Sequence, residues 1–170
     1  EAVAGLCPLT EASLGDGIFN AEKYLPAGGR FGIGTDSNID IDAALELRQL
    51  EYSQRLKHRG RNLIATVEGE SNGARLFVEA LRGGAQALDR PMGSLEAGKR
   101  ADIVVLDDTH PDFASAGVNR WLDAWIFVAG RGAVQRVMAG GEWVVKEGQH
   151  VRRESIRAKY SAALKGLAHG

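Results

Sequence analysis

Residues 30–38 read Arg30-Phe31-Gly32-Ile33-Gly34-Thr35-Asp36-Ser37-Asn38, a short β-strand pattern that ends in polar side chains. Phe31, Ile33 and Thr35 are strand formers, and two glycines precede the run. From Asp40 to about Leu56, apolar residues recur at helical spacing, which predicts an amphipathic helix. The order of strand, acid and helix is that of one β/α unit of a barrel, in which the carboxyl ends of the strands face the active site.

Asp36 has two interpretations on spacing alone. Aspartate is common at turns and at the starts of helices, so Asp36 could cap or close a turn. A carboxylate at the end of a barrel strand could instead bind a metal ion or act as a base. The spacing leaves both interpretations open.

The segments on either side of this unit are expected to be a loop and a second helix. Pro8, Gly15 and Gly17 interrupt residues 5–17, which predicts a loop that follows a strand. A helix is expected from near Ser71, with Gly83-Gly84 ending it and a shorter helical turn following through Leu88. These segments would complete the end of the β/α part.

After residue 90 the pattern becomes β-rich. Strands are expected at residues 101–106, 125–128, 134–139 and 142–146, and Gly140-Gly141 predicts a tight hairpin between the last two. Asp102 follows a basic pair, so we expect it to form a structural salt bridge. A helix is expected from Glu154 to Leu167. We therefore divide the chain into residues 1–90, a β/α part; 91–151, a sheet part; and 152–170, a terminal helix.

The composition excludes several classes of protein. Of 170 residues, 44% are hydrophobic, and 21 Lys and Arg against 22 Asp and Glu leave a net charge of −1. Such a chain has no basic field for nucleic acid. It also has no run of about 20 apolar residues to cross a membrane. The single cysteine, Cys7, is typical of a reducing compartment, so we expect a cytoplasmic protein. Because the first residue is Glu1 and not Met, we expect this chain to be part of a longer protein.

Three stretches resemble the amidohydrolase superfamily. They are Gly34-Thr35-Asp36-Ser37, the loop from Cys7-Pro8 to Gly17, and residues 93–107, Gly-Ser-Leu-Glu-Ala-Gly-Lys-Arg-Ala-Asp-Ile-Val-Val-Leu-Asp. The resemblance implies an α/β chain: the C-terminal fragment of a metal-dependent (β/α)₈ barrel, followed by part of a composite β-sandwich domain and a terminal helix. It also implies a small-molecule substrate and a homodimer as the full-length protein.

Residues 10–17 and 45–56 resemble one branch of that superfamily more closely. This branch hydrolyses the formimino C–N bond of N-formimino-L-glutamate, giving N-formyl-L-glutamate and ammonia in histidine degradation. Related purine and S-adenosylhomocysteine deaminases usually carry Ser-Asn where this chain has Thr10-Glu11. An aminohydrolase acting on a purine or guanidino-type substrate is the alternative.

The resemblance also implies roles for five residues. Asp36 matches the aspartate that binds the divalent metal, usually Zn²⁺, and that handles a proton of the attacking water. Ser37 and Asn38 could orient Asp36, or cap the following helix. Thr10 and Glu11 would lie at the barrel mouth and could shape the pocket, or serve only hydrogen bonding within the loop.

The histidines do not match the superfamily's metal-binding motifs. They are His58, His110, His150 and His169, and we expect ordinary structural or surface roles for them. The remaining ligands are therefore expected before Glu1, and the isolated chain is expected to be inactive. A different class of function, a non-catalytic β-rich interaction module with a tryptophan-bearing sheet, would also lack these ligands. Cys7 is expected to be a small buried residue rather than a nucleophile.

Overall fold

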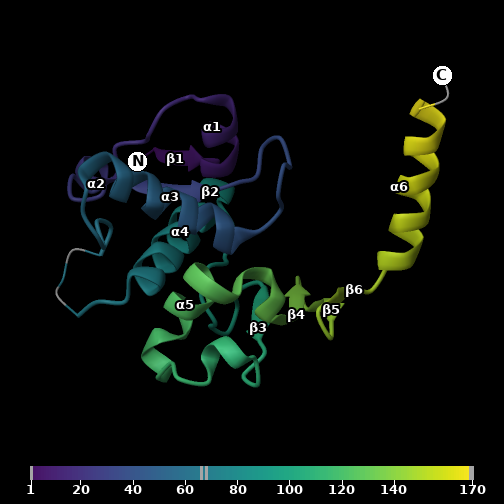
Figure 1. Ribbon diagram of the computed structural model, residues 1–170. Helices are drawn as coiled ribbons and strands as arrows, with labels where there is room; N and C mark the ends of the chain where they lie inside the picture. Colours follow the sequence, from purple (N-terminus) through teal and green to yellow (C-terminus); the bar gives the residue numbers. More distant parts are fainter. Residues whose placement is uncertain (1, 66, 68, 169–170) are drawn as a thin grey trace.

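The computed structural model describes residues 2–65, 67 and 69–168, which form a body of strands and helices, a small sheet and a projecting helix (Figure 1). The first elements are β1 (Val3–Leu6), α1 (Pro8–Leu14), α2 (Ala21–Tyr24), β2 (Arg30–Ile33), α3 (Ala43–His58), α4 (Asn72–Leu88) and β3 (Ile103–Leu106). Short helical turns follow: η1 (Pro111–Phe113), η2 (Val118–Arg120), α5 (Trp121–Ala124), η3 (Trp125–Ala129) and η4 (Gly130–Ala133). The chain ends with β4 (Val134–Ala139), β5 (Glu142–Lys146), β6 (Gln149–His150) and α6 (Arg153–Ala168).

Strands β1 and β2 form a parallel pair, in register from Val3 opposite Arg30 to Leu6 opposite Ile33. The strand predicted at residues 30–35 is confirmed as β2, and the helix predicted from residue 40 is confirmed as α3. Asp42 caps α3 by accepting hydrogen bonds from the first-turn N–H groups. Because the two strands are parallel, the chain leaves both at the same edge of the sheet.

The prediction of a loop over residues 5–17 is wrong in its centre, where α1 forms. Pro8 lies at the first helical position, where its missing N–H has no intrahelical partner to lose and its fixed φ suits the helix. Gly15 then ends the helix in the left-handed region, at φ 76°. Pro8 and Gly15, two of the three residues that suggested a loop, are thus the start and stop signals of a short helix.

The predicted end of the second helix at Gly83-Gly84 is also wrong, because α4 continues to Leu88. Gly83 is buried where α4 crosses β2, and a Cβ at that position would overlap the backbone carbonyl of Phe31. Gly84 lies next to Gly32 of the same strand. The glycines therefore allow the helix and the strand to approach closely, and they do not end the helix.

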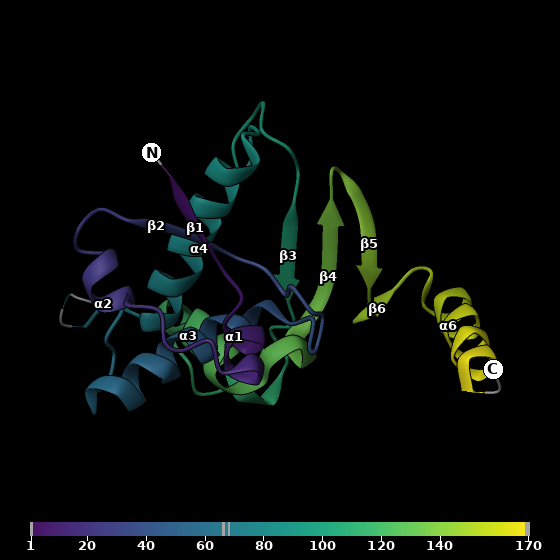
Figure 2. The same ribbon diagram turned by 90° about the horizontal axis from the view of Figure 1, so that it is seen from above.

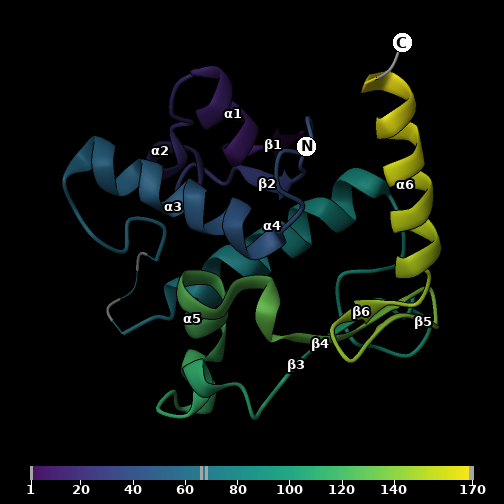
Figure 3. The ribbon, with the colours of Figure 1, turned by 45° about the vertical axis from the view of Figure 1, so that its right-hand side comes forward.

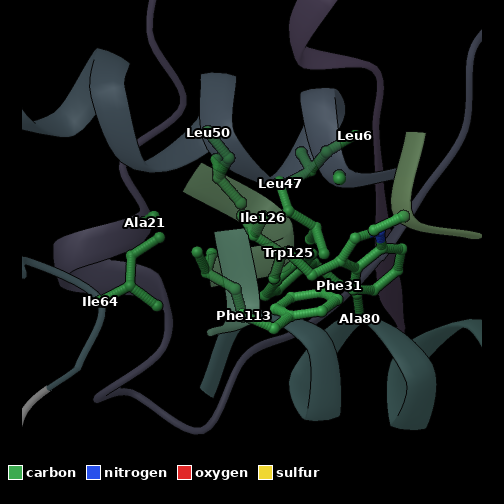
Figure 4. Packing of buried hydrophobic residues seen from close by; sticks show 13 residues of the cluster. Leu6, Ala21, Phe31, Leu47, Leu50, Ile64, Ala80, Phe113, Trp125 and Ile126 are labelled. Carbon is green, nitrogen blue, oxygen red and sulfur yellow. The ribbon is translucent and has the colours of Figure 1, made fainter. Parts of the chain in front are cut away.

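The strand predicted at residues 125–128 is a helical turn, η3, which follows α5. Its side chains enter the core, where Trp125 and Ile126 meet Phe31, Leu47 and neighbouring apolar residues (Figure 4). Burial of such side chains contributes about 1.5–3 kcal/mol each. A continuous apolar run fits a buried helix as well as a strand, which explains the error.

The second sheet has the strand order β3-β4-β5-β6, all antiparallel, and lies beside the helical body (Figure 2). The strands predicted at residues 101–106, 134–139 and 142–146 are confirmed. The hairpin is confirmed as well, with both turn glycines at positive φ, 61° for Gly140 and 90° for Gly141. Asp102 forms the expected salt bridge, 3.2 Å from Arg100, and accepts a hydrogen bond from the Gly140 N–H.

Helix α6 confirms the terminal helix and stands apart from the body, beyond β6 (Figure 3). Its described residues are all exposed. Between β3 and β4 the chain returns to the body, because η3 packs on α3 and α5 packs on α4. The divisions at residues 90 and 151 stay predictions. Over the described residues, no helix has both the length and the apolar character needed to cross a membrane.

Candidate functional site

The loops that follow β1 and β2 meet at one edge of the parallel pair. The Gly34 N–H donates to the Leu6 carbonyl oxygen at 2.9 Å, which extends the ladder by one bond beyond the strands. Cys7 follows β1, and Asp36 lies three residues after the end of β2. Asp36 is exposed at this edge, as expected for an acid at the carboxyl end of a barrel strand.

Asp36 occupies a tight turn formed by residues 35–38. The Asn38 N–H donates to the Thr35 carbonyl oxygen at 2.9 Å, and the Thr35 hydroxyl donates to the Asn38 side-chain oxygen at 2.8 Å. Asp36 and Asn38 have positive φ values of 42° and 54°. Asn38 therefore closes the turn, and its side chain is hydrogen-bonded to Thr35.

Thr10 of α1 contacts this turn directly. Its side chain is only 3% exposed. The Thr10 hydroxyl donates to the Thr35 carbonyl oxygen at 3.2 Å and lies 3.0 Å from the Ser37 hydroxyl oxygen. The structure thus brings Thr10 of α1 against Ser37 within the Asp36 turn.

Glu11 and Cys7 belong to the beginning of α1. The Cys7 N–H donates to a Glu11 carboxylate oxygen at 2.8 Å, so Glu11 binds its own helix start. Glu11 also lines a cavity of about 130 Å³ between α1 and α3. Burial, followed by the charges of Asp36, Glu46 and Glu11, raises the pKa of the Cys7 thiol. A raised pKa keeps the thiol protonated at neutral pH, which disfavours a nucleophilic role.

Glu46 is a polar residue of this edge that sequence reasoning missed. It lies in the first turn of α3, is 1% exposed and accepts a hydrogen bond from the Leu9 N–H at 2.9 Å. Its other carboxylate oxygen is buried with no hydrogen-bond partner. Burial raises the pKa of Glu46; the Leu9 N–H opposes this shift, and neighbouring acids including Glu11 add to it. Its position three residues after Ala43 and four before Leu50, on the same helix face, was the available signal.

The described residues contain no group of three or more potential metal ligands. His58 lies 3.2 Å from Glu22, while His110 and His150 accept backbone N–H bonds two residues along the chain. His169 lies outside the described residues. No described residue donates a hydrogen bond to the Asp36 carboxylate, so its oxygens are available to a ligand. Asp36 therefore fits one position of a divalent-metal site, although a single carboxylate does not hold a metal ion.

Sequence comparison relates the chain to hydrolases. The model of the amidohydrolase family matches residues 1–144. A formimidoylglutamate deiminase from Pseudomonas aeruginosa is 50% identical over 92% of this chain and 35% of its own length. A 5-methylthioadenosine/S-adenosylhomocysteine deaminase from Pyrococcus abyssi is 30% identical over 84% of this chain and 32% of its own length. The chain thus spans about a third of the length of these curated relatives.

Solved structures show the same relation. An amidohydrolase from Brucella melitensis superposes with a TM-score of 0.87 at 45% identity, over 98% of this chain and 36% of the other. An adenosine deaminase from Xanthomonas campestris, solved with bound zinc, gives a TM-score of 0.77 at 25% identity, over 95% and 36%. These neighbours confirm the expected fold class, an α/β fragment of a barrel enzyme. The family model, the curated relatives and the superposed structures agree, and the chain belongs to the amidohydrolase family.

Proposed function

We propose that this chain is the C-terminal third of a metal-dependent hydrolase that converts N-formimino-L-glutamate and water to N-formyl-L-glutamate and ammonia. The observation that carries the proposal is the 50% identity to a formimidoylglutamate deiminase over 92% of the chain. Throughout, the full-length protein means the longer amidohydrolase that we propose contains this chain.

Asp36 is the residue of this chain that we propose binds the metal, with the other ligands supplied by the rest of the full-length protein. Zinc is the ion we propose, because the related adenosine deaminase was solved with zinc. A divalent cation bound there would lower the pKa of a bound water to about 7, which makes hydroxide available at neutral pH. The exposed carboxylate of Asp36 has the position and charge to accept the proton that the water loses.

The reaction balances with water as the only co-reactant. The water oxygen bonds to the formimino carbon, and the carbon passes through a tetrahedral state. Asp36 takes one proton from the water and returns it to the terminal nitrogen, and the remaining proton of the hydroxyl now on the carbon is transferred to the same nitrogen. The bond between the carbon and that nitrogen then breaks, ammonia leaves, and the carbon keeps the oxygen as a formyl group.

A second candidate is an aminohydrolase that acts on a purine or guanidino-type substrate. It is favoured by the relatives named for the deamination of 5-methylthioadenosine and S-adenosylhomocysteine, at 26–33% identity. Such an enzyme would use Asp36 in the same way. The non-catalytic module is a third possibility, and it predicts no turnover of any of these compounds.

The test is ammonia release by the full-length protein from N-formimino-L-glutamate, adenosine, S-adenosylhomocysteine and a guanidino compound, compared at equal concentrations. The proposal predicts the highest kcat/KM for N-formimino-L-glutamate. A higher value for a purine would keep the hydrolase and replace the substrate, while no release from any compound would support the module. We also propose that the full-length protein is a homodimer, which sedimentation can check.

A further inference from the structure

The turn that carries Asp36 combines an uncommon backbone conformation with few internal hydrogen bonds. Two of its residues, Asp36 and Asn38, adopt left-handed backbone conformations at φ 42° and 54°. A left-handed conformation is uncommon for a residue with a side chain, although Asp and Asn adopt it more readily than other such residues. It persists only where the surroundings hold it in place. The internal bonds of the turn join Thr35 to Asn38 and leave Asp36 itself unheld.

One hydroxyl from another element holds both neighbours of Asp36. The Thr10 oxygen lies 3.2 Å from the Thr35 carbonyl oxygen and 3.0 Å from the Ser37 hydroxyl oxygen. A threonine hydroxyl has a single proton to donate and two lone pairs. Since a carbonyl can only accept, Thr10 donates to Thr35, and Ser37 must then donate to Thr10. The chain of bonds runs in one direction, from Ser37 through Thr10 to Thr35.

Thr10 is itself firmly placed, because α1 is fixed at its beginning by two carboxylates. Glu11 accepts the Cys7 N–H at 2.8 Å, and Glu46 of α3 accepts the Leu9 N–H at 2.9 Å. Thr10 is 3% exposed, so water has little access to its hydroxyl. The position of the Asp36 turn is thereby connected to the buried face of α3.

We propose that Thr10 is the positioning residue of the Asp36 carboxylate, acting through its hydroxyl on the residues either side of Asp36. The inference rests on the proposed role of Asp36 as a metal ligand and adds to it the group that fixes its location. Residues that orient a ligand typically contribute about 10- to 100-fold to metal affinity or activity. Thr10 would therefore affect zinc binding without touching zinc or substrate.

The experiment measures the zinc affinity of the full-length protein by competition with a chelator, and separately kcat at saturating zinc. Thr10→Val removes the hydroxyl while nearly keeping the shape, and Thr10→Ser keeps the hydroxyl. We expect Thr10→Val to weaken zinc binding about 10- to 100-fold and Thr10→Ser to retain most of the wild-type affinity. Ser13→Ala, an exposed hydroxyl on the same helix, is the matched control and should equal wild type.

Ser37→Ala keeps the test valid if Thr10→Val fails to fold, because Ser37 is exposed. It breaks one of the two bonds, so we expect a smaller loss of zinc affinity than for Thr10→Val, about 3- to 10-fold. Wild-type affinity in Thr10→Val, or an equal loss in Thr10→Val and Thr10→Ser, would overturn the inference. If Thr10→Val does not fold, wild-type affinity in Ser37→Ala would overturn it.

Asp36→Asn serves as the reference that separates the two proposals. If Asp36→Asn loses zinc and the Thr10 and Ser37 variants do not, the positioning inference alone fails. If Asp36→Asn binds zinc as wild type does, the proposed metal site fails, and the inference about Thr10 fails with it.

Discussion

The edge that carries Asp36 and the antiparallel sheet behind it differ in where their polar side chains lie. In the described part of the chain, the buried polar and charged side chains all belong to residues 10–72: Thr10, Asp42, Glu46, Glu51, Gln54 and Asn72. Strands β3 to β6 contain no fully buried residue. Burying polar groups costs free energy unless they are hydrogen-bonded. In the first region, buried polar side chains form hydrogen bonds that hold loops in fixed positions. The sheet is held instead by backbone hydrogen bonds between its strands and by half-buried apolar side chains.

The largest expected effect comes from making the same change in both regions. Asp36→Asn should abolish turnover by the full-length protein, because it removes the charge that the proposed metal site needs. Its fold should survive, since Asp36 is exposed and asparagine tolerates a positive φ. Asp102→Asn, at the residue before β3, should retain turnover. Ammonia release and circular dichroism check both variants, and turnover by Asp36→Asn would contradict its role.

The next effect concerns the stability of the first region. Glu51 is fully buried and accepts hydrogen bonds from the Leu63 and Ile64 N–H groups and from Arg55. Glu51→Ala would leave buried donors without partners, and we expect a loss of about 3 kcal/mol in the free energy of unfolding.

Urea denaturation of the full-length protein measures the Glu51→Ala loss. Glu96→Ala, which removes an exposed carboxylate next to Lys99 near the sheet, should change stability little and serves as the control. Equal effects of the two changes would remove the contrast between the regions.

Alanine substitutions at the adjacent glycines Gly83 and Gly84 should change the free energy of unfolding by smaller amounts and in opposite directions. Gly83→Ala should cost about 2 kcal/mol, because its methyl group would overlap the Phe31 carbonyl and overpacking outweighs the gain in helix propensity. An added Cβ at Gly84 meets no atom within 4 Å. Gly84→Ala should therefore stabilise the helix by about 0.5–1 kcal/mol. Unfolding midpoints of the two variants provide the measurement, and a gain in Gly83→Ala would contradict the close packing of α4 on β2.

The smallest effect is a pH dependence from Glu46. Burial raises the pKa of Glu46 above its ordinary value of 4.5, so the folded protein holds this proton more tightly than the unfolded chain does. Its contribution to stability is fully present below pH 4.5 and is lost as the pH rises through the raised pKa. Glu46→Gln should therefore gain stability relative to wild type as the pH rises. Free energies of unfolding of wild type and Glu46→Gln, measured from pH 4.5 upward, test this. Parallel pH curves for the two proteins would contradict it.

The sequence predicts the local features of both regions better than the contacts between them. The apolar spacing of residues 40–56 predicts α3, and Gly140-Gly141 predicts the hairpin, because helix period and turn chemistry are local. The predictions from Pro8, Gly83 and the run at residues 125–128 are wrong because the roles of these residues depend on position within a helix or on a packing partner.

The candidate site also has one part that the sequence predicts and contacts that it does not. Asp36 is found from the order of strand, acid and helix, together with family resemblance. The contact of Thr10 with Ser37 spans 27 residues, and that of Leu9 with Glu46 spans 37 residues. No local pattern reports such pairs, so the support of the Asp36 turn appears only once α1 and α3 are placed in space.

The central claim is that the Asp36 edge belongs to a metal-dependent hydrolytic site. The most direct test is ammonia release from N-formimino-L-glutamate by the full-length protein before chelator treatment, after it, and after zinc is restored. We predict that turnover falls to background with the chelator and returns with zinc. Turnover that persists unchanged in the chelator, with no metal bound, would contradict the claim.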